Sequence, residues 1–125
     1  MSNGVGIILD DVPIHRIGGG SAANLALKPL EKTLVPPGIS TFQGGTPAEA
    51  AEVMRRQYRR MAPRGQTVVG TTTAGQIREA GFDVIMHATS RFPQHVRLIH
   101  PGGADGFTDE NLERLVLAFE DHTGL

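Results

Sequence analysis

The stretch ISTFQGGTPAEAAEVMRRQYRRMAPRGQTVVGT, residues 39–71, decides the fold, because two strand patterns enclose one helix pattern. Thr46 and Glu49 fit a capping box, and Pro47 suits the first helical position, so a helix is predicted to begin here. Apolar residues then recur at helical spacing until Pro63 ends the pattern. The β-branched and aromatic residues before and after this helix predict a strand on each side.

The neighbouring segments extend this mixture of strands and helices in both directions. Short strands are predicted over residues 5–9, 14–17, 39–43, 67–71, 82–87 and 94–100. Three further helices are predicted, each after a hydroxyl residue that can cap it and each stopped by Pro or Gly, over residues 22–27, 73–81 and 108–124. The regular strand–helix alternation of a doubly wound sheet is missing. We therefore expect a single α+β domain over residues 1–125, with a mixed or antiparallel sheet, continuous or split, flanked by two main helices.

Length and composition limit the function classes. A chain of 125 residues with 39% apolar and 20% charged residues can bury a core without metal or disulfide support. It has no Cys, which excludes disulfide scaffolds, Cys-based zinc sites and thiol nucleophiles. The net charge of −1 gives no general attraction to nucleic acid or to an anionic membrane. The early apolar run over residues 5–9 is too short for a signal peptide or a membrane span, so the expected compartment is the cytoplasm of the producing cell or of a target cell.

Two segments carry groups that can bind anions. The Gly-rich residues 18–21 can present backbone N–H groups to a phosphate, although they match no nucleotide-binding fingerprint and fit a plain turn better. Arginines cluster at the end of the helix predicted over residues 46–61, namely Arg55, Arg56, Arg59, Arg60 and Arg64. They form either a solvated face or a patch for RNA, phosphate or an acidic partner.

The late strands carry the residues most suited to proton transfer. His95 and Arg97 share one side of their strand by the period-two alternation, so they can combine proton transfer with anion stabilisation. His87 and His100 belong to the same pair of strands. Their spacing is not that of a zinc site, and no metal is expected.

Several short motifs follow one another along the chain. His15 and Arg16 lie on an early predicted strand, and Ser40-Thr41-Phe42 opens a later one. Residues 82–100 then supply a strand, a Pro-containing loop and a second strand before the last helix. In this order the motifs resemble a compact ADP-ribosyltransferase fold. The resemblance covers about two-thirds of the chain and is closest to small toxins of this fold, delivered by type VI secretion or carried at the tips of Rhs-type proteins.

The resemblance implies NAD as substrate and assigns roles to individual residues. Arg16 would anchor an NAD phosphate or ribose, Ser40 and Thr41 would support the nicotinamide ribose, and Phe42 or Phe92 would flank the nicotinamide. The strand of Arg97 would lie on the acceptor side. The family's usual catalytic Glu has no clear counterpart, and the nearest acids are Asp105, Asp109 and Glu110. The candidate catalytic residues are therefore His95, Arg97 and Asp105.

Three function classes follow from these observations. The first is an NAD-dependent toxin or effector that modifies a protein or nucleic-acid target, or hydrolyses NAD, and that is neutralised by a cognate immunity protein. The second is a metal-free RNase-like toxin in which His95 works with His100 or His87, and Arg97 holds phosphate. The third is a non-enzymatic interaction module of the immunity or adaptor type.

Overall fold

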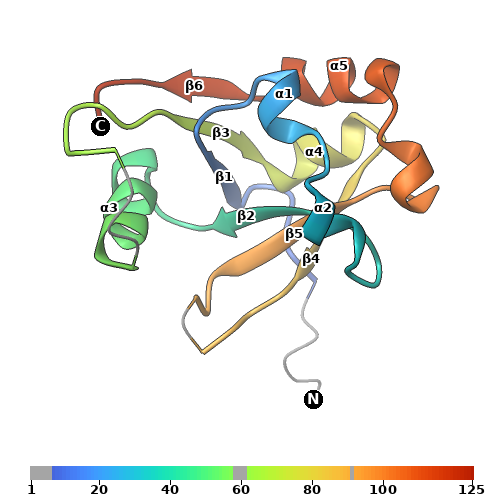
Figure 1. Cartoon of the computed structure of the whole chain (residues 1–125), viewed down its shortest axis with the longest axis horizontal. Helices are drawn as coiled ribbons and strands as arrows, with labels where there is room; N and C mark the ends of the chain where they lie inside the picture. The colour runs from blue at the N-terminus through green and yellow to red at the C-terminus, as the bar shows by residue number, and fades with distance from the viewer. Residues whose placement is uncertain (1–6, 58–61, 91) are drawn as a thin grey trace.

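The computed structural model describes residues 7–57, 62–90 and 92–125, which fold into six strands and several short helices (Figure 1). The strands are β1 (Pro13–Ile17), β2 (Ile39–Gln43), β3 (Val69–Thr73), β4 (Asp83–Met86), β5 (His95–Ile99) and β6 (Glu120–His122). The helices are α1 (Ala22–Leu25), α2 (Pro29–Lys32), α3 (Pro47–Gln57), α4 (Ala74–Glu79), the 3-10 turn η1 (Gly103–Gly106) and α5 (Asp109–Ala118).

The strands form one antiparallel sheet in the order β4-β5-β2-β1-β3-β6. This confirms an α+β domain with an antiparallel sheet. The longest described helices, α3 and α5, are those expected to flank it.

The middle of the sheet is nearly divided. β1 pairs with β2 only through Ile14–Gln43 and His15–Phe42, whereas β1 pairs with β3 along all five of its residues. Beyond His15, β1 therefore leaves β2 and continues beside β3 alone. The sheet consists of two halves, β4-β5-β2 and β1-β3-β6, that are joined at one end and parted at the other.

Each face of the sheet has a different cover. The main core lies on one face, where side chains such as Ile14, Ile39 and Leu98 pack against α1, α4 and α5. On the other face, α3 packs mainly on β1 and β3, and Ala51 packs there against Val69. In Figure 1, α3 stands apart from the other helices. The face of β2, β5 and β4 beside α3 is where the site described below is found.

Several boundaries were predicted accurately because their chemistry is local. β2 spans the predicted residues, and the Thr46–Glu49 capping box forms, with Thr46 N–H donating to Glu49 and Glu49 N–H donating to the Thr46 hydroxyl. Ser21 and Thr108 also cap their helices. The predicted helix end near residue 61 lies outside the described residues.

Other predictions were wrong. Residues 7–9 form no strand, and Ile8 is buried in the main core instead; the rest of the predicted strand lies outside the described residues. Pro29 does not merely stop a helix but begins α2. β3 starts two residues later than predicted. The last helix ends at Ala118 rather than near Gly124, and Glu120–His122 pairs with β3 instead.

Among the helices of the described residues, none combines the length and the apolar character needed to cross a membrane.

Candidate functional site

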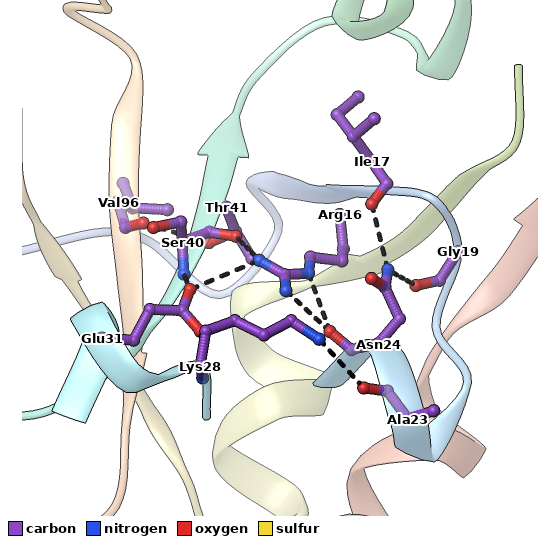
Figure 2. Close-up of polar contacts among 10 residues, drawn as sticks. All are labelled: Arg16, Ile17, Gly19, Ala23, Asn24, Lys28, Glu31, Ser40, Thr41 and Val96. Atoms are coloured by element: carbon purple, nitrogen blue, oxygen red, sulfur yellow. Dashed lines mark hydrogen bonds and ion pairs between the residues drawn. The ribbon is translucent and has the colours of Figure 1, made fainter. Parts of the chain in front are cut away.

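A pair of charged side chains fills the gap where β1 and β2 part (Figure 2). In β2, the backbone groups of Ser40 point toward the side that β1 has left. The Ser40 N–H donates to Glu31 Oε2 at 2.8 Å, and the Ser40 carbonyl oxygen accepts from Arg16 Nη1 at 2.7 Å. Arg16 and Glu31 thus take the place of a neighbouring strand, because unpaired backbone groups at this buried position would be costly.

The guanidinium of Arg16 is held from several sides. Its Nε and Nη2 both donate to the carbonyl oxygen of Asn24, at 3.0 and 2.7 Å, and Nη1 lies 3.5 Å from Glu31 Oε2. Burial lowers the pKa of Arg16, and the Glu31 carboxylate opposes that shift. The side chain of Asn24 in turn donates to the carbonyl oxygens of Ile17 and Gly19, which ties the Gly-rich loop to the same network.

A cavity of about 420 Å³ opens beside this network, on the sheet face next to α3. Its polar lining includes Arg16, Glu31 and Ser40, and its aromatic lining comes from Phe42, Phe92, His87 and His95. The cavity therefore collects residues from both halves of the sheet. Its volume lies within the range of about 300–1,000 Å³ that is usual for small-molecule sites.

The aromatic side of the cavity is built from edge-to-face contacts. The ring of Phe42 lies 5.3 Å from Phe92 and 5.4 Å from His95, measured between centroids. The rings of His87 and His95 are 4.8 Å apart. In a chain with only 5% aromatic residues, this concentration around one cavity supplies a surface for a planar ring.

His95 is oriented by a backbone group. Its Nδ1 lies 3.1 Å from the carbonyl oxygen of His87, which only accepts hydrogen bonds, so the neutral ring carries its proton on Nδ1. Its Nε2 has no hydrogen bond to any part of the chain that the structure describes. An imidazole fixed in this tautomer presents a proton acceptor at the cavity wall.

Burial also keeps both histidines neutral. It is the main cause that lowers the pKa of His95, and it outweighs the hydrogen bond to the His87 carbonyl oxygen, which raises that pKa. The pKa of His87 is lowered by burial and by Arg97. Near neutral pH, both rings are therefore uncharged and able to accept a proton.

Not every candidate residue from the sequence lies at this cavity. Arg16, Ser40, Phe42 and His95 line it, as does Phe92. Thr41 points to the opposite face, where it is fully buried and donates to the Val96 carbonyl oxygen. Arg97 is buried and does not line the cavity, and its Nη1 donates to the Pro36 carbonyl oxygen. Asp105 is exposed on η1 and lies outside the lining.

His100 is separate from the other two late histidines. Its ring stacks edge-to-face on Phe82, with centroids 5.0 Å apart, and its Nδ1 accepts from the Gly102 N–H. This packing gives His100 a structural role, so only His87 stands beside His95 in the cavity.

The cluster of arginines at the end of α3 is partly neutralised. Glu52 accepts from both Arg55 and Arg64, and these contacts lower the pKa of Glu52 to about 2. Arg55 also donates to Thr67. Arg59 and Arg60 lie outside the described residues. Within the described part of this helix and the loop after it, two arginines are thus used in ion pairs rather than left available for an anion.

Glu31 and His87 are the site residues that sequence reasoning undervalued. Glu31 is 7% exposed, and it also accepts from the Lys28 N–H at the start of α2. The signal was present in the capping pattern of Lys28, Pro29 and Glu31, but a carboxylate in a short helix is usually solvated. Across residues 7–57, 62–90 and 92–125, no group of three or more His, Asp or Glu side chains is arranged to hold a metal.

Comparisons with protein-family models, with curated proteins and with solved structures find no match to this chain.

Proposed function

We propose that this domain binds NAD in the cavity between the two sheet halves and breaks the bond between nicotinamide and ribose. The observation that carries the proposal is that Arg16 of one half and Ser40 of the other meet at the point where the sheet parts, beside an aromatic cavity. This is the arrangement that the resemblance of the sequence to ADP-ribosyltransferases implies.

The cavity chemistry suits one end of a dinucleotide. The rings of Phe42 and Phe92 offer apolar surface to a planar base, and Ser40 offers its hydroxyl beside it. The donors of Arg16 are largely used within the protein, and Glu31 balances its charge, so its role in the proposal is to hold the cleft rather than to clamp a phosphate.

The proposed reaction balances without an added oxidant or metal. The C1′–N bond of NAD breaks, and nicotinamide leaves with the electron pair of that bond. An acceptor oxygen, from water or from a protein or nucleic-acid target, forms the new bond to C1′. The proton of that acceptor passes to Nε2 of His95, the unprotonated nitrogen of a ring that lines the cavity. This assigns to an imidazole the role that a Glu has in the family.

Nicotinamide release tests the proposal directly. The purified domain is incubated with NAD, with and without bacterial lysate, and nicotinamide is quantified by chromatography. Nicotinamide should accumulate in proportion to the protein concentration. No release above background in either condition would reject the proposal.

The proposal includes action as an effector against bacteria, with an immunity protein as the cognate partner. Expression in the bacterial cytoplasm should then slow growth, and a His95→Gln variant should relieve the effect. A domain that is harmless when expressed, with the same growth for the wild type and for His95→Gln, would instead favour a non-enzymatic interaction module.

A second candidate function is RNA cleavage, favoured by the contact between the rings of His87 and His95. One histidine would take the proton of a ribose 2′-hydroxyl as its oxygen attacks phosphorus, and the other would protonate the departing 5′ oxygen. The second step needs one protonated ring, and the lowered pKa values of both rings place the optimum below neutral pH. Intact RNA after incubation in EDTA at mildly acidic pH would rule this function out.

A further inference from the structure

A second cavity lies on the same sheet face, across the ring of Phe42 from the first. It has a volume of about 330 Å³ and is lined by Phe42, Gly44, Glu49, Ala50, Val53 and Gln94, among others. It is therefore framed by the end of β2, the turn after it, the first turns of α3 and the residue before β5. Phe42 forms a wall of both cavities.

The polar groups of this second cavity are mainly hydrogen-bond acceptors. Gln94 Oε1 is buried and has no hydrogen-bond partner within the described residues. Glu49 uses Oε1 to accept from the Thr46 N–H at 2.9 Å, and no described residue donates to its Oε2. An acceptor buried without a donor is costly, so a ligand that donates to Gln94 Oε1 gains more than it would at a solvated surface. Glu49 is exposed and supplies charge at the edge of the cavity.

The charge of the cavity is negative. Hydrogen bonds from the backbone and side chain of Thr46 lower the pKa of Glu49, so this carboxylate is ionised at neutral pH. The N-terminus of α3 contributes about half a positive charge, which offsets part of the full charge of the carboxylate. His15, which interacts electrostatically with Glu49, has its pKa lowered by burial and is neutral.

The remaining lining is apolar. Ala50 and Val53 project from α3 and face the ring of Phe42 across the cavity. At Gly44, an added Cβ would meet no atom within 4 Å, so the entrance beside the turn is open. An apolar channel that leads to acceptors and a carboxylate fits an aliphatic stem with a cationic end.

We propose that this second cavity binds a cationic side chain, lysine or arginine, of the protein on which the domain acts. The binding step stands on the second cavity alone. The link to modification rests on the proposed function, under which a basic side chain held beside Phe42 would bring a basic surface of the target next to NAD.

Titration of small probes, followed by NMR of the labelled domain without NAD, tests the binding step. The probes are Nα-acetyl-arginine amide, Nα-acetyl-lysine amide and the uncharged Nα-acetyl-citrulline amide. At least one cationic probe should shift the side-chain amide signals of Gln94 and the backbone signals of Gly44 and Gly45. Citrulline should bind roughly tenfold more weakly, because it lacks the charge.

Two variants sharpen the result. Glu49→Gln removes the charge but keeps a residue that can form the capping box, since Gln serves at this position too. This variant should lower the affinity for the cationic probe by about fivefold. Gln94→Glu adds a second carboxylate and should strengthen binding. Equal binding of citrulline, unchanged affinity in Glu49→Gln or no shifts at these residues would overturn the proposal.

The two proposals fail independently. Nicotinamide release with no probe binding would support the NAD proposal and reject the proposal that the second cavity binds a cationic side chain. Probe binding with no nicotinamide release would support a basic partner for the second cavity and reject NAD cleavage.

Discussion

Arg16 Nη1 donates to the carbonyl oxygen of Ser40 at 2.7 Å, and this contact links two strands at a point where their backbones no longer pair. The guanidinium and the Glu31 carboxylate together satisfy backbone groups that a neighbouring strand would otherwise satisfy. The gap between the sheet halves is therefore a stabilised feature of the fold, and the cavity depends on it.

Breaking this pair should cost much of the stability of the domain. Arg16→Met and Glu31→Gln should each lower the free energy of unfolding by about 3 kcal/mol, because each leaves the other partner buried without its counter-charge. The double variant should lose less than the sum of the two. Urea denaturation of all four proteins provides the double-mutant cycle; strictly additive losses would show that the two side chains act independently.

Removal of the candidate base should affect catalysis far more than folding. His95→Gln should lower the rate of nicotinamide release roughly 100-fold, in the range expected for loss of general base catalysis, with a smaller change in KM. His122→Gln is the matched control, because His122 lies on β6, away from the cavity. Equal losses in both variants would indicate a general effect on the fold.

Stability should decrease as the pH falls below the ordinary His value. His15, His87 and His95 all have a lowered pKa in the folded protein, with burial as the main cause, against 6.5 in the unfolded chain. Below pH 6.5 these histidines bind more protons in the unfolded state than in the folded state, so the free energy of unfolding falls. Denaturation at about pH 7.5 and about pH 5.5 measures the difference.

His15 should account for part of that pH dependence. It is fully buried and hydrogen-bonded to Thr71 and to the carbonyl oxygens of Gly44 and Gly45. His15→Gln should lower stability at every pH but reduce the loss between the two pH values. An unchanged loss would assign the effect to the cavity histidines instead.

The backbone packing beneath the Gly-rich loop should not tolerate a methyl group. A Cβ at Gly70 would lie 2.6 Å from the backbone nitrogen of Gly20 and 2.9 Å from the carbonyl carbon of Gly19. Gly70→Ala should therefore destabilise the domain by roughly 1–3 kcal/mol, as overpacking usually does. Thermal unfolding provides the measurement, and a melting temperature equal to that of the wild type would contradict the close approach.

Local chemistry explains which elements could be predicted from the sequence. β2 and the capped helix starts are encoded within a few residues, by Gly and Pro at their ends and by hydroxyl caps. β6 was missed because Glu120–His122 has no apolar alternation and continues a helical pattern. Its strand conformation comes from pairing with β3, which lies about 50 residues earlier in the chain.

The candidate site was only partly accessible to the same reasoning. Period-two alternation already implies that Ser40 and Thr41 face opposite sides, so only one of the two hydroxyls could reach a shared cavity. The burial of Glu31 could not be predicted, since it depends on β1 and β2 parting in the folded sheet. The second cavity likewise requires Gln94 and Glu49 to meet across elements far apart in sequence.

The order β4-β5-β2-β1-β3-β6 has a kinetic consequence. Only β1–β2 and β4–β5 join strands that follow each other in the chain. The other strand pairs can form only after long loops have closed, so the entropy cost of loop closure comes before the stabilising contacts. Such a topology raises contact order, and contact order slows folding. The domain should therefore assemble more slowly than a helical bundle of the same length, with the pairing of β2 and β5 among the late, rate-limiting events.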